Sequence, residues 1–320
     1  MSLLKPRLSP VLTQDVIDTL RKQGVRTVLD FLEHNAEEMV KKAGMSYKDV
    51  LAIRHVLLAQ YSAVPVNGAD MYEDALNSMA ILPTGVKSLD TMLDGGLYTS
   101  EVTELVGPAG VGKSQLCMYT SLNISRNLKQ NIMYIDSTGD FCIQRLQDIL
   151  YSDQVEDEEI IDVLSRIKCS RAFDIFEVLA QLCEVTNHLT AQTNAFYQHL
   201  KLVIVDSLPA VVLPVLGGAQ TDGHGYLMHL ARMMKTLAVD FNLALMTTNN
   251  VVQGEAGETK PALGRAWSHI PNTRVEIKKQ DITPDGENRR TAVLTKCSRQ
   301  PTGLTAEFTI TPSGIETYHS

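Results

Sequence analysis

The segment Gly107–Ser114 constrains the fold of this chain more than any other part of its sequence. It reads Gly-Pro-Ala-Gly-Val-Gly-Lys-Ser and matches G-x-x-x-x-G-K-[ST], the pattern of a loop that binds nucleotide phosphates. The strand-like run Val102–Val106 precedes it directly, and a helical pattern through Leu128 follows it. Because the motif requires this strand–loop–helix context, the sequence predicts a nucleotide-binding loop and not a glycine-rich turn.

The residue types of the loop suit a phosphate ligand. Glycines let successive N–H groups curl around an anion at the positive end of the following helix. Lys113 is predicted to bridge the β- and γ-phosphates of ATP, and the Ser114 hydroxyl to bind Mg²⁺. The predicted ATP-binding residues of the loop are Gly107, Pro108, Ala109, Gly110, Val111, Gly112, Lys113 and Ser114.

A second candidate residue, Asp206, ends the apolar run Leu202–Val205. A buried parallel strand delivers its last residue at the carboxyl edge of the sheet, where ligands of such sheets bind. An isolated aspartate at a strand end caps a helix more often than it holds a metal. The presence of Lys113 and Ser114 favours the metal-binding role, so Asp206 is predicted to belong to the ATP site and to help hold Mg²⁺.

From Glu101 onward, strand-like and helix-like segments alternate, which predicts βαβ units and a parallel sheet that is buried on both faces. After residue 270 the pattern turns to strands, with a hairpin turn expected at Asp285-Gly286. Further predicted strands are Ile132–Ile135, Leu243–Met246, Arg274–Lys278, Arg290–Thr295 and Thr305–Thr311, and helical patterns cover 173–189 and 225–239. We therefore expect an α/β core over 83–320, with a mostly parallel twisted sheet, flanking helices and antiparallel C-terminal strands.

The first sixty residues have the pattern of a small all-α domain. Thr13, Asn35 and Ser46 precede apolar periodic segments as N-caps, and Gly24 and Gly44 mark helix ends. Short helices joined through such turns are typical of helix-hairpin-helix packing, and a protein-docking module is an equally supported alternative. Residues 61–82 contain proline and Asn-Gly and are predicted to be a linker between residues 1–60 and the core.

Composition excludes several classes of protein. No apolar run reaches the length of about 18 residues that a membrane span needs, and the first residues do not form a signal peptide. The five cysteines form no C-x-x-C pair, which favours free thiols over a zinc site or a disulfide scaffold. With a net charge of −8, affinity for nucleic acid requires a local basic patch.

Many segments of the chain resemble the RecA/RadA recombinase family. They are Thr84-Gly85, Leu89-Asp90, Leu93, Gly95-Gly96, Glu101 and Glu104 before the loop, Gln115 after it, the block Tyr134–Gly139, and Lys260-Pro261, Gly264, His269 and Arg274. Within the family, Pro65–Asp70, Ala172–Phe176, Pro261–Ser268 and Ser298–Gly303 are most similar to the D-type recombinase paralogues, the Rad-fifty-one D class. The resemblance covers nearly the whole chain. It implies a RecA-like P-loop ATPase core that binds ATP with Mg²⁺, with Arg145 against the adenine.

The chain departs from the strand-exchange recombinases of the family at three positions. Those enzymes carry a water-activating glutamate two positions after the aspartate that ends a strand, whereas this chain has Thr138. A threonine cannot act as a general base near neutral pH, so a contribution of about 10²–10⁴-fold to the rate is missing. Asn250 replaces a glutamine that senses the γ-phosphate. In the docking motif of the linker, Ala69 is kept but Val66 replaces a phenylalanine.

The resemblance places two DNA-binding loops at about 208–224 and 250–264. The first has no lysine or arginine, and the second contains Lys260 and Arg265, which are predicted to contact DNA. Nine cations lie between 260 and 299 against four acids, Glu276, Asp281, Asp285 and Glu287; the cations are Lys260, Arg265, Arg274, Lys278, Lys279, Arg289, Arg290, Lys296 and Arg299. This stretch could follow a single strand through phosphate contacts, or its charges could protect a sheet edge against aggregation.

These observations favour an ATP-binding recombination mediator in the homologous-recombination repair of DNA breaks and crosslinks. The resemblance implies a nuclear hetero-oligomer that binds single-stranded DNA and promotes recombinase filaments. The C-type paralogue is expected on the ATPase core, and the small paralogue on the N-terminal domain and linker. Two alternatives are an adaptor that uses ATP as a structural cofactor without touching DNA, and a self-assembling strand-exchange recombinase. Thr138 predicts a weak DNA-dependent ATPase.

Overall fold

The structure is a computed structural model that describes residues 3–61, 65–192, 194–216, 222–254, 259–280 and 288–318. The chain divides into two compact units, Met1–Glu73 and Asp74–Ser320. This division falls within the stretch 61–82 that the sequence predicts as a linker. Each unit has a hydrophobic core of its own, so each is described by itself.

The first unit is helical, as predicted. Its elements are the 3₁₀-helix η1 (Pro6–Leu8) and the helices α1 (Gln14–Lys22), α2 (Val28–Glu33), α3 (Ala36–Ala43) and α4 (Tyr47–Tyr61). Thr13 caps α1 by accepting a hydrogen bond from the N–H of Val16, and Asn35 caps α3 by accepting one from Glu38. The apolar faces of these helices meet in a small core that includes Ile17, Phe31, Met39, Ile53 and Leu57.

The predicted linker is not extended throughout, because helix α5 covers Gly68–Ser78. The Asn67 side chain, which the sequence suggested as part of a turn, accepts hydrogen bonds from the N–H groups of Ala69 and Asp70 and so begins the helix. Alanine, methionine, leucine and glutamate follow, and these residues favour a helix. None of the residues of α5 is buried.

The second unit is built on a nine-stranded sheet with the order β13-β12-β11-β10-β3-β7-β6-β4-β5. The neighbouring strands in the part β10-β3-β7-β6-β4-β5 pair parallel. The C-terminal strands β10, β11, β12 and β13 pair antiparallel, as predicted. The bounds are β3 (Val102–Val106), β4 (Asn131–Asp136), β5 (Ile167–Arg171), β6 (Leu200–Asp206), β7 (Ala244–Asn249), β10 (Thr273–Lys279), β11 (Arg289–Lys296), β12 (Thr305–Thr311) and β13 (Gly314–Thr317). The hairpin turn expected at Asp285-Gly286 lies outside the described residues.

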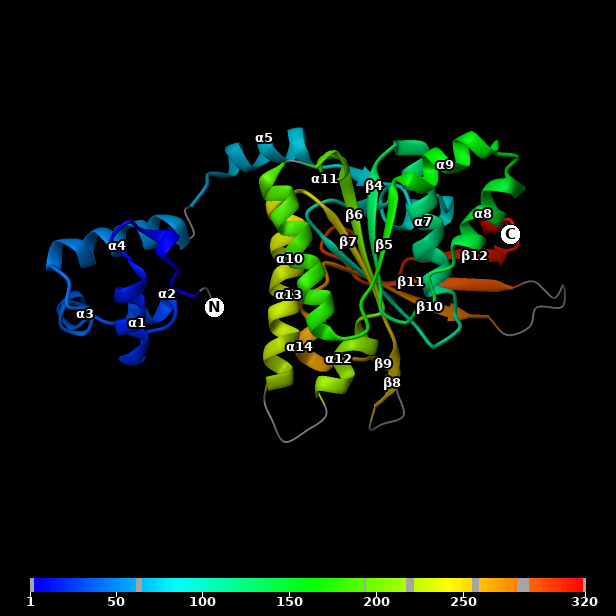
Figure 1. Cartoon of the computed structure of the whole chain (residues 1–320). Coiled ribbons are helices and arrows are strands. Elements are labelled where there is room, and N and C mark those ends of the chain that lie inside the picture. Colours follow the sequence, from blue (N-terminus) through cyan, green and yellow to red (C-terminus); the bar gives the residue numbers. More distant parts are fainter. Residues whose placement is uncertain are drawn as a thin grey trace. The chain divides into compact units, whose positions relative to one another are not determined.

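Helices cover both faces of this sheet (Figure 1). One face packs against α7 (Lys113–Leu128), α8 (Ile143–Ser152) and α9 (Asp157–Ser165), and the other against α10 (Ile175–Ala191), α12 (Leu208–Leu216) and α13 (Asp222–Asp240). The shorter elements are α6 (Lys87–Met92), α11 (Ala195–Gln198), α14 (Gly264–Ser268), the strand pair β1 (Ile81–Leu82) and β2 (Leu97–Tyr98), and the hairpin β8 (Val251–Gln253) and β9 (Thr259–Pro261). Among the described residues, no helix is long and apolar enough to cross a membrane.

Candidate nucleotide-binding site

The glycine loop connects the carboxyl end of β3 to the first turn of α7. Gly107 lies so close to β10 that a side-chain carbon on it would come within 2.5 Å of the carbonyl oxygen of Ile277. Gly112, immediately before the helix, has φ of 107°, which other residues rarely adopt. The residues between these two glycines include Pro108, Ala109 and Gly110, which are exposed. The loop therefore forms an open turn at the positive end of α7, where a phosphate fits.

Lys113 folds back onto this loop. Its Nζ donates hydrogen bonds to the carbonyl oxygens of Gly107 at 2.7 Å and Pro108 at 2.9 Å. The side chain is 8% exposed, and burial lowers the pKa of its ammonium group, while the charge of Asp206 opposes that shift. Among the described residues, the ammonium group thus has only carbonyl oxygens as hydrogen-bond partners, and phosphate oxygens would be stronger partners at the same place.

Asp206 lies at the end of β6, as predicted, and both of its carboxylate oxygens accept hydrogen bonds. The Tyr134 hydroxyl donates to Oδ2 at 2.7 Å, and the Thr248 hydroxyl donates to Oδ1 at 2.5 Å. Burial raises the pKa of the Tyr134 phenol well above its ordinary value, so it remains a donor. Sequence reasoning missed Tyr134 and Thr248 as parts of the site. A tyrosine within a buried apolar strand was the available signal, since its hydroxyl needs a partner.

The neighbouring strand β4 ends in a turn that Asp136 organises. Its carboxylate accepts hydrogen bonds from the N–H groups of Thr138 at 3.1 Å, Gly139 at 2.8 Å and Phe141 at 3.2 Å. Thr138 is exposed, and its hydroxyl donates a hydrogen bond of 3.4 Å to the same carboxylate. Asp136 is therefore occupied with shaping the turn, and the position two residues after it presents a hydroxyl and not a carboxylate.

These residues fit a Mg²⁺-bound nucleotide. The open turn offers backbone N–H groups, Lys113 offers a cation, and Ser114 and Asp206 offer one hydroxyl and one carboxylate. Among the described residues, no group of three or more histidine, cysteine, aspartate or glutamate side chains could hold a metal by itself. A site with so few protein ligands suits Mg²⁺, which commonly keeps several waters and takes its other oxygens from the phosphates.

Comparison with known proteins agrees with this geometry. The profile of the Rad51 family matches residues 76–318, and that of the RAD51D N-terminal domain matches residues 1–60. The chain belongs to the Rad51 family. It is 44% identical to DNA repair protein RAD51 homolog 4 of Bos taurus over 95% of this chain and 93% of that protein. The Mus musculus protein of the same name is 43% identical over 99% of this chain and 97% of that protein. DNA repair and recombination protein RadA of Aeropyrum pernix is 24% identical over 97% of this chain and 94% of that protein. The resemblance to D-type recombinase paralogues is confirmed.

In this member of the Rad51 family, Arg145 joins three elements next to the loop. Its Nε donates to the Gln115 side chain at 2.9 Å, and its two terminal nitrogens donate to the carbonyl oxygens of Thr311 and Pro312. Arg145 thereby ties α8 to the first turn of α7 and to the connection between β12 and β13. Its contact with adenine stays a prediction.

A second polar network lies entirely inside the core. The Glu104 carboxylate, 0% exposed on β3, accepts hydrogen bonds from Asn249 and Trp267 at 2.7 Å and from Arg274 at 2.5 Å. Asn249 also donates to the carbonyl oxygen of Ala262. The network therefore joins the strand that precedes the nucleotide loop to the segment that follows hairpin β8–β9. Asn250, which replaces the glutamine that senses the γ-phosphate in the family, comes directly after β7. The effect of this replacement stays a prediction.

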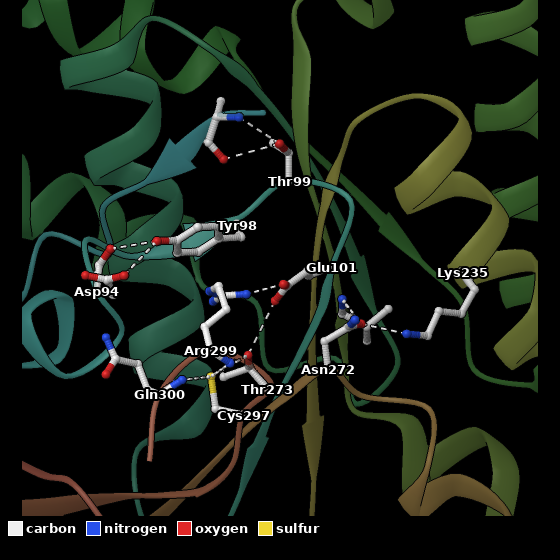
Figure 2. Close-up of polar contacts among 12 residues, drawn as sticks. Asp94, Tyr98, Thr99, Glu101, Lys235, Asn272, Thr273, Cys297, Arg299 and Gln300 are labelled. Atoms are coloured by element: carbon white, nitrogen blue, oxygen red, sulfur yellow. Dashed lines mark hydrogen bonds and ion pairs between the residues drawn. The ribbon is translucent and has the colours of Figure 1, made fainter. Parts of the chain in front are cut away.

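The basic stretch 260–299 does not form one continuous DNA-facing surface. Figure 2 shows one reason: Arg299 pairs with Glu101 and lies over the ring of Tyr98, with its charged carbon 3.5 Å from the ring centre. Arg274 and Arg290 donate to buried acceptors, and Lys296 and Arg299 donate to half-buried ones. Lys260 and Arg265 are exposed, on β9 and α14 respectively, so the two predicted DNA contacts remain accessible.

The prediction of a loop at 208–224 is wrong for the residues that the structure describes, because they are helical. Residues Leu208–Leu216 form α12, and α13 begins at Asp222. Pro209 lies in the first turn of α12, where a missing N–H costs nothing, and Val211 and Val212 pack into the core. In the second predicted loop, 250–264, strands β8 and β9 pair as a hairpin with Val252 opposite Lys260.

Proposed function

We propose that this chain is an ATP-binding mediator of homologous recombination, acting in the nucleus in the repair of DNA breaks and crosslinks. It would assemble with other recombinase paralogues and help a recombinase form filaments on single-stranded DNA. The names of its relatives describe DNA repair and recombination, which supports the general role. The finer role of a mediator is our proposal.

One observation carries the proposal: the nucleotide site has the residues for binding but lacks one for turnover. Lys113 and Ser114 begin α7, which follows β3, and Asp206 ends β6, with β7 between these two strands. Asp206 is near enough to Lys113 for its charge to raise the pKa of the ammonium group. Thr138 occupies the position at which strand-exchange enzymes carry the water-activating glutamate. Binding without efficient hydrolysis suits a subunit whose nucleotide stabilises an assembly, and it predicts a weak DNA-dependent ATPase.

The proposed assembly is a hetero-oligomer. Val66 is 55% exposed before α5, and the apolar side chains of Met71, Tyr72 and Leu76 are exposed along that helix. Replacing the phenylalanine of the docking motif by Val66 loses about 1–2 kcal/mol of burial, which disfavours self-polymerisation. We propose that residues 1–82 hold the small paralogue. The C-type paralogue would bind the ATPase core at β5, the strand that ends the sheet order.

The proposed contact with single-stranded DNA runs through Lys260 and Arg265. Lys260 lies on β9 of the hairpin and Arg265 on α14, which follows it. Phosphate contacts from such cations give binding that weakens steeply with salt. If DNA is never touched, the adaptor alternative holds, and ATP is then a structural cofactor only.

The proposal is tested by filament formation. A recombinase would be mixed with single-stranded DNA, with and without the complex of this chain and its paralogue partners, and filament formation followed by light scattering. We expect the complex to increase filament formation, and the same complex with Lys113→Ala to do so less. No effect of the wild-type complex, together with no measurable affinity for single-stranded DNA, would favour the adaptor. Filaments formed by the chain alone with ATP would favour the strand-exchange enzyme.

A further inference from the structure

Arg290 lies behind the nucleotide loop, on the second residue of β11. Its side chain is 3% exposed, and its Nε donates a hydrogen bond of 2.7 Å to the carbonyl oxygen of Val111. A side-chain carbon on Gly112, the next residue, would lie 4.0 Å from the same Nε. The guanidinium group therefore contacts the loop from the side of the C-terminal strands.

Arg290 is a buried cation whose recorded partners are carbonyl oxygens. Besides Val111, Nη1 donates to the carbonyl oxygen of Arg289 at 3.0 Å. Within the described part of the chain no carboxylate pairs with it, and burial alone lowers its pKa. Arg274 on the neighbouring strand differs, since its buried carboxylate partner is Glu104. Burying a charge without a counter-charge is costly, and a bound anion nearby would offset that cost.

The hydrogen bond to Val111 also orients the loop. In a planar trans peptide the carbonyl oxygen and the N–H point in opposite directions. Because Arg290 holds the carbonyl oxygen of Val111 on the side of β11, the N–H of Gly112 points away from β11. The positive φ of Gly112 is compatible with this orientation, and Lys113 then begins α7. A donor in this orientation contributes to the cradle of N–H groups that a phosphate needs.

The geometry points to Arg290 as a positioning residue for the triphosphate. It holds the Val111–Gly112 peptide with its N–H toward the phosphate side and supplies a positive charge that bound phosphates compensate. This inference rests on the proposed nucleotide site. It adds to that site a residue of β11, which lies outside the loop motif Gly107–Ser114.

The test compares Arg290→Met with the wild-type full chain. Affinities for ATP, ADP and AMP with Mg²⁺ would be measured by competition against a fluorescent ATP analogue, and melting temperatures without nucleotide by thermal denaturation. We expect Arg290→Met to bind ATP about tenfold more weakly or worse, because a hydrogen bond to the loop and a nearby charge are lost. The loss of affinity should be largest for ATP, smaller for ADP and smallest for AMP. Arg290→Lys, which keeps the charge, should bind ATP more tightly than Arg290→Met.

The melting temperature without nucleotide separates this role from a merely structural one. Arg290→Met removes a buried charge that lacks a counter-charge, so its melting temperature should equal or exceed that of the wild type. The matched control Arg274→Met leaves the Glu104 carboxylate without its cation, so it should melt lower and keep the wild-type ratio of ATP to AMP affinity. Equal losses for ATP and AMP, or a melting temperature lowered as in the control, would overturn the inference. Failure of the wild type itself to bind ATP would instead reject the nucleotide site.

Discussion

The hydroxyl of Tyr134 is a sensitive point at which to perturb the site, because in the described part of the chain it is the one side-chain donor to Oδ2 of Asp206. Tyr134 is 1% exposed, and Asp206 is 3% exposed. Changing Tyr134 to Phe removes the 2.7 Å hydrogen bond to Oδ2 and keeps the ring, which packs against Phe141 with centres 4.8 Å apart. The change therefore isolates one hydrogen bond to a buried carboxylate and creates almost no cavity.

A hydrogen bond to a charged group contributes about 1.5–3 kcal/mol to stability. For a domain of this size class, each kcal/mol lowers the melting temperature by about 2–4 °C, so Tyr134→Phe should melt about 3–12 °C lower without nucleotide. The variant leaves Oδ2 of Asp206 short of a donor, and a Mg²⁺-bound nucleotide offers that oxygen a new partner. Saturating Mg·ATP should therefore raise the melting temperature of the variant by more than it raises that of the wild type.

Thermal denaturation of the full chain with and without Mg·ATP measures both effects. The matched control is Tyr119→Phe on α7, since the described part of the chain records no hydrogen bond for the Tyr119 hydroxyl and burial also raises its pKa. This control should melt close to the wild type. If Tyr134→Phe melted like the control, the reasoning that Asp206 depends on Tyr134 would be refuted.

Three further predictions concern turnover, DNA and assembly. Thr138→Glu restores a carboxylate at the water-activating position and should raise the ATPase rate, whereas a wild-type rate equal to that of a full recombinase would contradict our account. Lys260→Ala and Arg265→Ala should each weaken binding to single-stranded DNA and reduce the slope of log affinity against log salt by about 0.7; unchanged slopes would exclude phosphate contacts there. Ala69→Glu places a charge in the exposed first turn of α5, which the helix tolerates, and should abolish co-purification with the small paralogue. Retained co-purification would refute the docking role of α5.

The nucleotide loop and the central strands could be predicted from the sequence because their signals are local. Val102–Val106 is an apolar run bounded by a motif, and the predicted and observed bounds of this strand agree. The strand β5 was missed for a physical reason: it ends the sheet, its side chains are mostly exposed, and Lys168 and Arg171 replace the apolar run of a central strand. Helix α5 was missed because the Asn67-Gly68 pair has the composition of a turn.

The contacts that complete the site could not be predicted, because they join segments far apart in the sequence. Tyr134 and Thr248 come from strands on either side of β6 and meet only when the sheet forms. The same holds for Arg290, which lies well after the loop that it contacts. In the sequence, Arg290 is one of the nine cations of the stretch 260–299, which suggested DNA binding. Only the structure shows that Arg290 is buried against the loop, unlike the exposed cations of that stretch.

The central claim is that this chain binds Mg·ATP through the loop at Gly107–Ser114, and calorimetric titration of the full chain tests it most directly. We expect the wild type to bind and Lys113→Ala to bind more than about tenfold more weakly, since the cation at the phosphates is lost. The matched control is Lys235→Ala. Burial also lowers the pKa of this lysine, but it donates to Asn272 near the amino ends of the strands, away from the loop at their carboxyl ends (Figure 2). Its affinity for ATP should equal that of the wild type. An unchanged affinity in Lys113→Ala would contradict the account.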